Sequence, residues 1–256
     1  MLKLWKEYSF DGKDQLFFKI GPLCLWIIKK SHEIKIYSHN SLAESDRQCI
    51  YSDSEIHEIH PQAVFQRIFL PNEIHQFKLV PLIPPKDIIF RPESPILLPS
   101  GKDMFLYVNT PFWLGMMVSN KIIFSTPIMK LKETYLGPIT EDGEILLAAK
   151  TRGVIDPNEI IIYPYRYICR INLHNNYSEI VPIERIRMLC DYLNVYGTKD
   201  DEYYSDEVEL TISETKEIKI KTTIPTSSKI KHLDKIIEAK DQHPHFIFRA
   251  FSSILS

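Results

Sequence analysis

Three aromatic and two charged side chains lie in one stretch of this chain at positions that suit ligand binding. Tyr107, Trp113 and Tyr135 are the aromatic members, and Glu133 and Arg152 are the charged ones. Aromatic rings pack against the apolar faces of a sugar or a peptide, while carboxylate and guanidinium groups hydrogen-bond to its polar groups. We expect a ligand-binding rim here, for a small polar ligand or for a partner protein.

The same aromatic residues have a structural interpretation. An aromatic side chain on a strand removes a large apolar area from water, so packing in a core explains it without any ligand. The binding hypothesis rests on Pro111, which lies between Tyr107 and Trp113 and cannot donate a backbone hydrogen bond. A proline there interrupts strand pairing and leaves a rim where an aromatic ring can face a ligand.

Carboxylates offer an alternative chemistry. Glu133, Glu144 and Glu184 would supply the acid and the base of a hydrolase acting on carbohydrate or a related polar polymer, if two of them were held about 5 to 10 Å apart. Ion pairs on the surface explain the same residues structurally, with Arg152, Arg185 and Arg187 as partners.

The sequence indicates no metal or cofactor site. His57, His60 and His75 lie near glutamates, but their spacing fixes no third ligand as a His-Glu-x-x-His helix does. The four cysteines form no Cys-x-x-Cys pair, and we expect them to be free thiols. With Gly 8 in the whole chain, no glycine-rich phosphate loop and no Gly-x-Ser-x-Gly turn are present.

Composition limits the partners further. Lys+Arg 31 against Asp+Glu 33 leaves a formal net charge of -2, which gives no electrostatic footprint for nucleic acid. The apolar run PLCLWII is far shorter than the roughly 20 residues that span a bilayer. The first residues turn polar at once, unlike a secretory signal peptide. We therefore expect a soluble, cytoplasmic protein without a transmembrane segment.

Strands must position these residues, because the hydrophobic period stays near two over most of the chain. Asp11-Gly12 and Asp142-Gly143 each separate two extended runs, and such pairs predict hairpins. Ile230, Leu233 and Ile237 instead follow helical spacing, as do the apolar residues from Ile247 to Leu255. We expect one or two short helices at the C-terminal end.

Six prolines lie between Pro81 and Pro99, and they favour an extended connector. The predicted organisation is therefore an N-terminal β domain at residues 1–85, a proline-rich connector at 86–100 and a β-sandwich domain at 101–256 with the helical segment at its end. Because crossover helices are absent from the pattern, the fold class is all-β, with two packed antiparallel β-sandwich-like domains.

From Gly101 onward the order of motifs resembles an uncharacterised prokaryotic family, domain of unknown function 432. The motifs in this chain are GKDMFLYVNTPFWL, LKETYLGPITEDGE, the strand from Pro164 to Arg170 that leads into NLHNNYSEIVPIERIRM, then LNVYG, DEVELTI and FRAF. The resemblance implies a shared fold and supplies no activity, cofactor or catalytic residue.

The function that the sequence favours is a non-enzymatic binding or protein-interaction module that uses the rim around Tyr107, Trp113 and Tyr135. The hydrolase remains an alternative. A structural subunit of a larger assembly is a second alternative, which would dock through an apolar patch at Phe246, Phe251 and Leu255.

Overall fold

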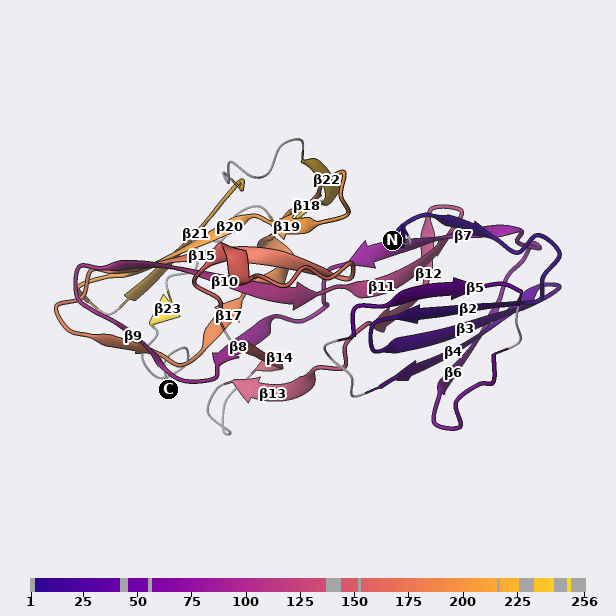
Figure 1. The fold of residues 1–256 in the computed structure, drawn as a ribbon, viewed down its shortest axis with the longest axis horizontal. Helices are drawn as coiled ribbons and strands as arrows, with labels where there is room; N and C mark the ends of the chain where they lie inside the picture. Colours follow the sequence, from indigo (N-terminus) through magenta and orange to yellow (C-terminus); the bar gives the residue numbers. More distant parts are fainter. Residues whose placement is uncertain are drawn as a thin grey trace. The chain divides into compact units, whose positions relative to one another are not determined.

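Strands make up most of this protein, and the all-β prediction is confirmed (Figure 1). The computed structural model describes residues 3–41, 46–54, 57–136, 144–151, 153–215, 217–225, 233–241 and 248–249. The chain divides into two compact units that are discontinuous in sequence. Unit 1 comprises residues 1–82, 111–130 and 163–165, and unit 2 comprises residues 83–110, 131–162 and 166–256. The sequence-based domain boundaries stay a prediction.

Unit 1 contains two antiparallel sheets. The first has the order β1-β7-β11-β12 and is built from β1 (Glu7–Ser9), β7 (Gln76–Leu82), β11 (Trp113–Val118) and β12 (Lys121–Pro127). The second has the order β5-β2-β3-β4-β6 and is built from β2 (Gln15–Ile20), β3 (Leu23–Lys30), β4 (Glu33–Asn40), β5 (Cys49–Ser52) and β6 (Val64–Phe69).

Aromatic rings join the inner faces of these two sheets. The rings of Tyr8 in β1 and Phe18 in β2 meet edge to face with centroids 4.9 Å apart. The ring of Phe77 in β7 lies 6.3 Å from that of Phe18, also edge to face. Both arrangements lie in the range that aromatic pairs favour. The core of unit 1 therefore lies between its two sheets, as in a β-sandwich.

The predicted hairpin at Asp11-Gly12 is wrong. Both residues have positive φ, at 43° for Asp11 and 77° for Gly12, as a tight turn requires. However, β1 pairs with β7, whereas β2 pairs with β3 and β5. The turn therefore carries the chain from one sheet of unit 1 to the other.

Unit 2 is built around a large mixed sheet with the order β22-β18-β19-β15-β20-β21-β23, in which β10 also pairs with β15. Its strands are β10 (Asp103–Pro111), β15 (Arg166–Asn175), β18 (Val195–Gly197), β19 (Tyr203–Ser205), β20 (Glu207–Ile212), β21 (Glu217–Thr223), β22 (Asp234–Ile237) and β23 (Phe248–Arg249).

Two smaller sheets complete unit 2. The first has the order β13-β14-β8-β17 and is built from β8 (Ile88–Pro92), β13 (Lys132–Leu136), β14 (Glu144–Thr151) and β17 (Ile186–Met188). The second pairs β9 (Ile96–Leu98) with β16 (Val181–Ile183). Two 3-10 turns lie at Pro157–Glu159 and Cys190–Tyr192.

Three strand pairs of unit 2 depart from the expected antiparallel arrangement. β15 runs parallel to both β19 and β20, and β8 runs parallel to β14. β13 and β14 pair antiparallel as expected, although the Asp142-Gly143 turn lies outside the described residues. Residues 86–100, predicted as a connector, supply β8 and β9.

The helix predicted from Ile230 to Ile237 is wrong where the structure describes it. Asp234–Ile237 forms β22, which pairs with β18 at the edge of the large sheet. The backbone pairing outweighs the weak helical spacing of three apolar residues. Most of the second predicted helix lies outside the described residues, and Phe248–Arg249 within it forms strand β23.

Candidate functional site

One face of the large sheet of unit 2 carries closely spaced polar side chains. Successive residues of a strand point to opposite faces. In β15, Ile171 and Leu173 are buried, whereas Arg170 and His174 are only partly covered. We call the less buried side the outer face, and it includes Asp103, Phe105 and Tyr107 of β10, Arg170 and His174 of β15, and Glu207 and Glu209 of β20.

A row of three ionisable groups crosses the outer face. Nδ1 of His174 lies 2.8 Å from Oδ1 of Asp103, and its Nε2 lies 3.8 Å from Oε1 of Glu209. The imidazole is 22% exposed, against 63% for Asp103 and 39% for Glu209. The central ring is therefore held in place while both carboxylates keep oxygens that reach solvent and can accept hydrogen bonds.

Arg170 organises a second row beside the first. Its Nη1 donates to both carboxylate oxygens of Glu207, at 3.1 Å each. Its guanidinium carbon lies 4.0 Å from the ring centroid of Phe105, a cation–π contact. Phe105 is nevertheless 40% exposed. The outer face thus presents the Phe105 ring next to the Asp103–His174–Glu209 row. Arg170, which Glu207 holds in place, contacts this ring.

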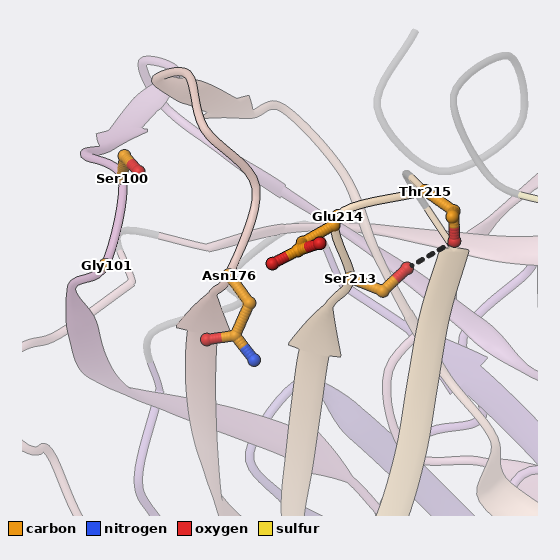
Figure 2. A pocket seen from close by; sticks show the side chains of 6 residues that line it. All are labelled: Ser100, Gly101, Asn176, Ser213, Glu214 and Thr215. Carbon is orange, nitrogen blue, oxygen red and sulfur yellow. Dashed lines mark hydrogen bonds between the residues drawn. The ribbon is translucent and has the colours of Figure 1, made fainter.

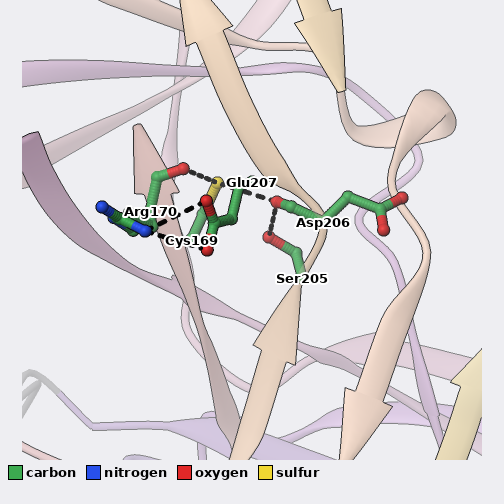
Figure 3. A network of polar contacts seen from close by, with 5 residues as sticks. All are labelled: Cys169, Arg170, Ser205, Asp206 and Glu207. Atoms are coloured by element: carbon green, nitrogen blue, oxygen red, sulfur yellow. Dashed lines mark hydrogen bonds and ion pairs between the residues drawn. The ribbon is translucent and has the colours of Figure 1, made fainter. Parts of the chain in front are cut away.

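A bulge between β19 and β20 determines where Glu207 lies. Ile168 pairs with Tyr204, whereas Ile171 pairs with Val208, so β20 is one residue out of step with β19 along β15. Figure 3 shows Asp206 at this step, with its carbonyl oxygen accepting from Cys169 Sγ at 3.6 Å. Bulges of this kind redirect the side chains that follow them.

The Asp206 carboxylate, 4% exposed, holds the bulge in place. Oδ2 accepts from the backbone N–H of Asn194 at 2.9 Å and from Nδ2 of the same residue at 2.7 Å. Oδ1 accepts from the hydroxyl of Tyr196 at 2.9 Å. Burial, and then the hydrogen-bonded Asp206 carboxylate, raise the pKa of the Tyr196 phenol to about 12. A buried carboxylate that accepts three hydrogen bonds is a structural anchor.

A shallow polar pocket of about 560 Å³ lies where the strands of the outer face end (Figure 2). It is lined by Ser100, Gly101, Asn176, Ser213, Glu214 and Thr215. The hydroxyls of Ser213 and Thr215 are hydrogen-bonded at 2.9 Å. Asn176 follows His174 by two positions and Gly101 precedes Asp103 by two, so the pocket borders the first row.

Four of the five residues predicted to bind a ligand are described by the structure, and these four lie in three different sheets. Tyr107 lies in β10 on the outer face, is half-buried and forms an isolated bridge with Val154. Trp113 lies in β11 of unit 1. Glu133 and Tyr135 share one face of β13 in another sheet of unit 2. Arg152 lies outside the described residues.

Glu133 and Glu144, two of the three carboxylates of the hydrolase alternative, do not face each other. Glu133 is opposite Leu147 and Glu144 is opposite Leu136, which places the two glutamates on opposite faces of the β13–β14 ladder. Oε1 of Glu133 lies 2.6 Å from Nζ of Lys86. Glu184 is exposed in the link between β16 and β17.

Glu144 instead belongs to an ion-pair cluster. Nη2 of Arg187 lies 2.6 Å from Oε2 of Glu144 and 2.7 Å from Oδ2 of Asp87. Burial raises the pKa of the Asp87 carboxyl, and Arg187 opposes that rise. Oδ1 of Asp87 also accepts from the backbone N–H of Cys190 at 3.0 Å. The cluster therefore connects β14 and β17 with the start of β8.

Two of the three histidines considered as metal ligands, His57 and His60, pack on the second sheet of unit 1. The ring of His57 stacks on Phe17 with centroids 4.1 Å apart, and that of His60 stacks on His39 at 3.7 Å. Burial and the neighbouring His60 lower the pKa of His39. Among the described residues, no three His, Cys, Asp or Glu side chains gather as metal ligands would.

Sequence reasoning missed most of the outer face. In the sequence, Arg170 and His174 alternate with apolar residues, which predicts only that they lie on the polar side of a strand, and nothing distinguishes Asp103. The alternation in RINLH and EVELT was the available signal, since it assigns these side chains to one side of a strand. It does not reveal which strands lie side by side.

Comparisons with known proteins identify a family and no activity. No helix within the described residues is long and apolar enough to cross a membrane. No curated protein and no solved structure matches this chain. A family model described as "Protein of unknown function (DUF432)" matches residues 4–255, which extends the resemblance seen from Gly101 onward to the N-terminal third. The chain therefore belongs to the DUF432 family.

Proposed function

We propose that this protein is a non-enzymatic binding module whose outer face takes a small ligand rich in hydroxyl groups, such as a carbohydrate. The observation that carries the proposal is the Asp103–His174–Glu209 row beside Phe105. These four side chains come from three neighbouring strands of one sheet.

The chemistry of the row suits hydroxyl groups. Asp103 and Glu209 are both partly exposed carboxylates, and an ionised carboxylate accepts hydrogen bonds without donating any. The exposed part of Phe105 offers an apolar surface for the C–H groups of a sugar ring. The adjoining pocket adds the hydroxyls of Ser213 and Thr215 and the carboxylate of Glu214.

Rigidity supports a binding role as well. Sites built on strands hold their side chains more closely to one geometry than sites on loops, so less conformational entropy is lost when a ligand binds. Asp206 anchors the bulge before β20, and Arg170 holds both Glu207 and Phe105. The outer face would therefore receive its ligand without rearrangement.

The hydrolase alternative is less well supported. Acid and base catalysis by two carboxylates requires that both flank one bond of the substrate. Glu133 and Glu144 point to opposite faces of their ladder, and each is engaged by a cation. The Phe246, Phe251 and Leu255 patch of the structural-subunit alternative lies outside the described residues.

An array of neutral and acidic oligosaccharides, probed with the labelled protein, tests the proposal. We expect the wild type to bind a subset of them, and the double variant Asp103→Asn, Glu209→Gln to bind that subset about tenfold or more weakly, because charge-assisted hydrogen bonds are lost. Glu133→Gln, which removes an exposed carboxylate from another sheet, is the matched control and should bind as the wild type does.

Two results would count against the proposal. One is a wild type that binds no oligosaccharide on the array and gains no thermal stability from any of them in solution. The other is binding that the double variant retains in full.

A further inference from the structure

Strand β6 is an open edge of unit 1. It is the last strand in the order β5-β2-β3-β4-β6, and in the described residues it pairs only with β4 (Figure 1). Backbone N–H and C=O groups on the far side of such a strand point away from the sheet, so an edge strand is a template for another strand.

This edge is also apolar. Val64 is 64% exposed, Phe65 48% and Phe69 68%. Protein edges are commonly protected by lysine, proline or a bulge within the strand, which discourage pairing with other chains. The sequence of β6, VFQRIF, contains no lysine and no proline, and its register with β4 runs unbroken from Val64 to Phe69. The one charged residue of β6, Arg67, is paired with Glu33, and no other feature within β6 opposes the addition of a strand.

The side chains of β6 alternate between two faces. Phe65 stacks on Tyr37 with centroids 4.8 Å apart, and Arg67 contacts Glu33 at 2.5 Å, so these residues share the side of the sheet that faces away from the core. Val64, Gln66 and Ile68 lie on the other side, in register with Ser38, Ile36 and Ile34 of β4.

We propose that β6 pairs antiparallel with β6 of a second copy of this chain, with Gln66 on the two-fold axis. In this register Val64 lies opposite Ile68 of the second copy, and Phe65 lies opposite Arg67 of the second copy. One pair is aliphatic and the other is a cation–π pair, and symmetry forms each of them twice.

Charge disfavours the neighbouring register that is centred on Arg67. In a continuous antiparallel sheet, residues directly opposite each other point to the same face, so the axis passes through a residue of the strand. An axis through Arg67 would set two guanidinium groups against each other, which is unfavourable. An axis through Gln66 places two neutral amides there. The pattern of β6 is thus complementary to itself, which favours a second copy over an unrelated peptide.

Disulfide trapping tests the register. Gln66→Cys places two thiols directly opposite each other, and mild oxidation should yield a covalent dimer on a non-reducing gel. Phe69→Cys is the matched control: in this register its two copies lie six residues apart along the strands, about 20 Å, which is too far for a disulfide. The wild type controls for the native cysteines. Cross-linking of Gln66→Cys no faster than that of Phe69→Cys would overturn the proposal.

Sedimentation equilibrium tests the chemistry of the pair. We expect a concentration-dependent dimer for the wild type and a monomer for Phe65→Lys, because lysine would face Arg67 of the second copy. Phe65→Glu should still dimerise, now with a dependence on salt. Ile122→Lys, at an exposed apolar position of edge strand β12, is the control and should dimerise as the wild type does. A monomeric wild type, or a Phe65→Lys dimer as tight as the wild type, would contradict the proposal.

Discussion

Oδ1 of Asp103 lies 2.8 Å from Nδ1 of His174, and the two residues are 71 positions apart in the sequence. The contact joins β10 to β15 on the outer face, and the parallel pairing of β15 with β20 adds Glu209 to the same row. A candidate binding surface is thus assembled from three distant segments by the order of strands in one sheet.

Removal of the anchor at the bulge should destabilise unit 2. Asp206→Ala leaves the buried Tyr196 hydroxyl and two part-buried donors of Asn194 without this acceptor, and we expect a loss of about 3 kcal/mol in the free energy of unfolding. Urea denaturation of the variant and the wild type measures this loss. Asp200→Ala, at an exposed aspartate, is the control. A loss for Asp206→Ala no larger than that of the control would refute the anchoring role.

Substitution of two glycines by alanine distinguishes the cost of backbone strain from the cost of steric crowding. Gly21 has φ +51°, and a Cβ there would lie 2.5 Å from the ring of Tyr165. Gly12 has φ +77° but nothing within 4 Å of such a Cβ. We expect Gly12→Ala to cost about 1 kcal/mol from strain alone, and Gly21→Ala to cost a further 1 to 3 kcal/mol, roughly, from overpacking. Equal melting temperatures for the two variants would show that the Tyr165 contact is unimportant.

The Asp11-Gly12 turn shows how much of the fold the sequence predicts. Asp11-Gly12 correctly indicated a tight turn with positive φ, because that conformation depends on the two residues themselves. It did not indicate the partners of β1 and β2, which lie in different sheets. Turn chemistry is local, whereas the choice of partner depends on packing between residues far apart in the chain.

The candidate site illustrates the same limit. Alternation assigned Arg170 and His174 to the polar side of a strand, and this assignment holds. The neighbours that give these residues a role, Phe105, Asp103 and Glu209, depend on strand order and register, which periodicity does not encode. Of the four predicted binding residues that the structure describes, only Tyr107 lies on the outer face.

Cysteine reactivity should follow burial. Burial raises the pKa of the Cys169 thiol to about 12 and raises that of Cys190 as well. Cys24 and Cys49 are only partly covered, and burial raises the pKa of Cys49 to about 11. Since the thiolate is the reactive form, all four should react slowly with iodoacetamide at pH 8, with Cys24 and Cys49 ahead of the other two.

Peptide mass spectrometry after timed labelling, with and without urea, measures these rates site by site. Urea should make the four rates similar, because unfolding removes the burial. Native labelling of Cys169 at its rate in urea would disprove the prediction.

The stacked histidines should make stability sensitive to acid. Burial and His60 lower the folded-state pKa of His39 below its usual value of 6.5. Between these two pKa values the unfolded chain binds more protons, so this contribution to stability is lost as pH falls from about 6.5 through the folded pKa. His60→Phe retains a stacking ring and removes the second imidazole. We expect a smaller fall in its urea midpoint between pH 7.5 and pH 5.5 than the wild type shows, and an unchanged fall would contradict this origin.

Backbone amide chemical shifts test the proposed ligand site most directly. The protein, labelled with ¹⁵N, would be titrated with the oligosaccharide that binds best on the array. We predict that the perturbed amides cluster at residues 101–107, 170–176 and 207–215, and that Phe105→Ala reduces the shifts at a given ligand concentration. Perturbations centred on β13 and β14, or confined to unit 1, would contradict a binding site on the outer face.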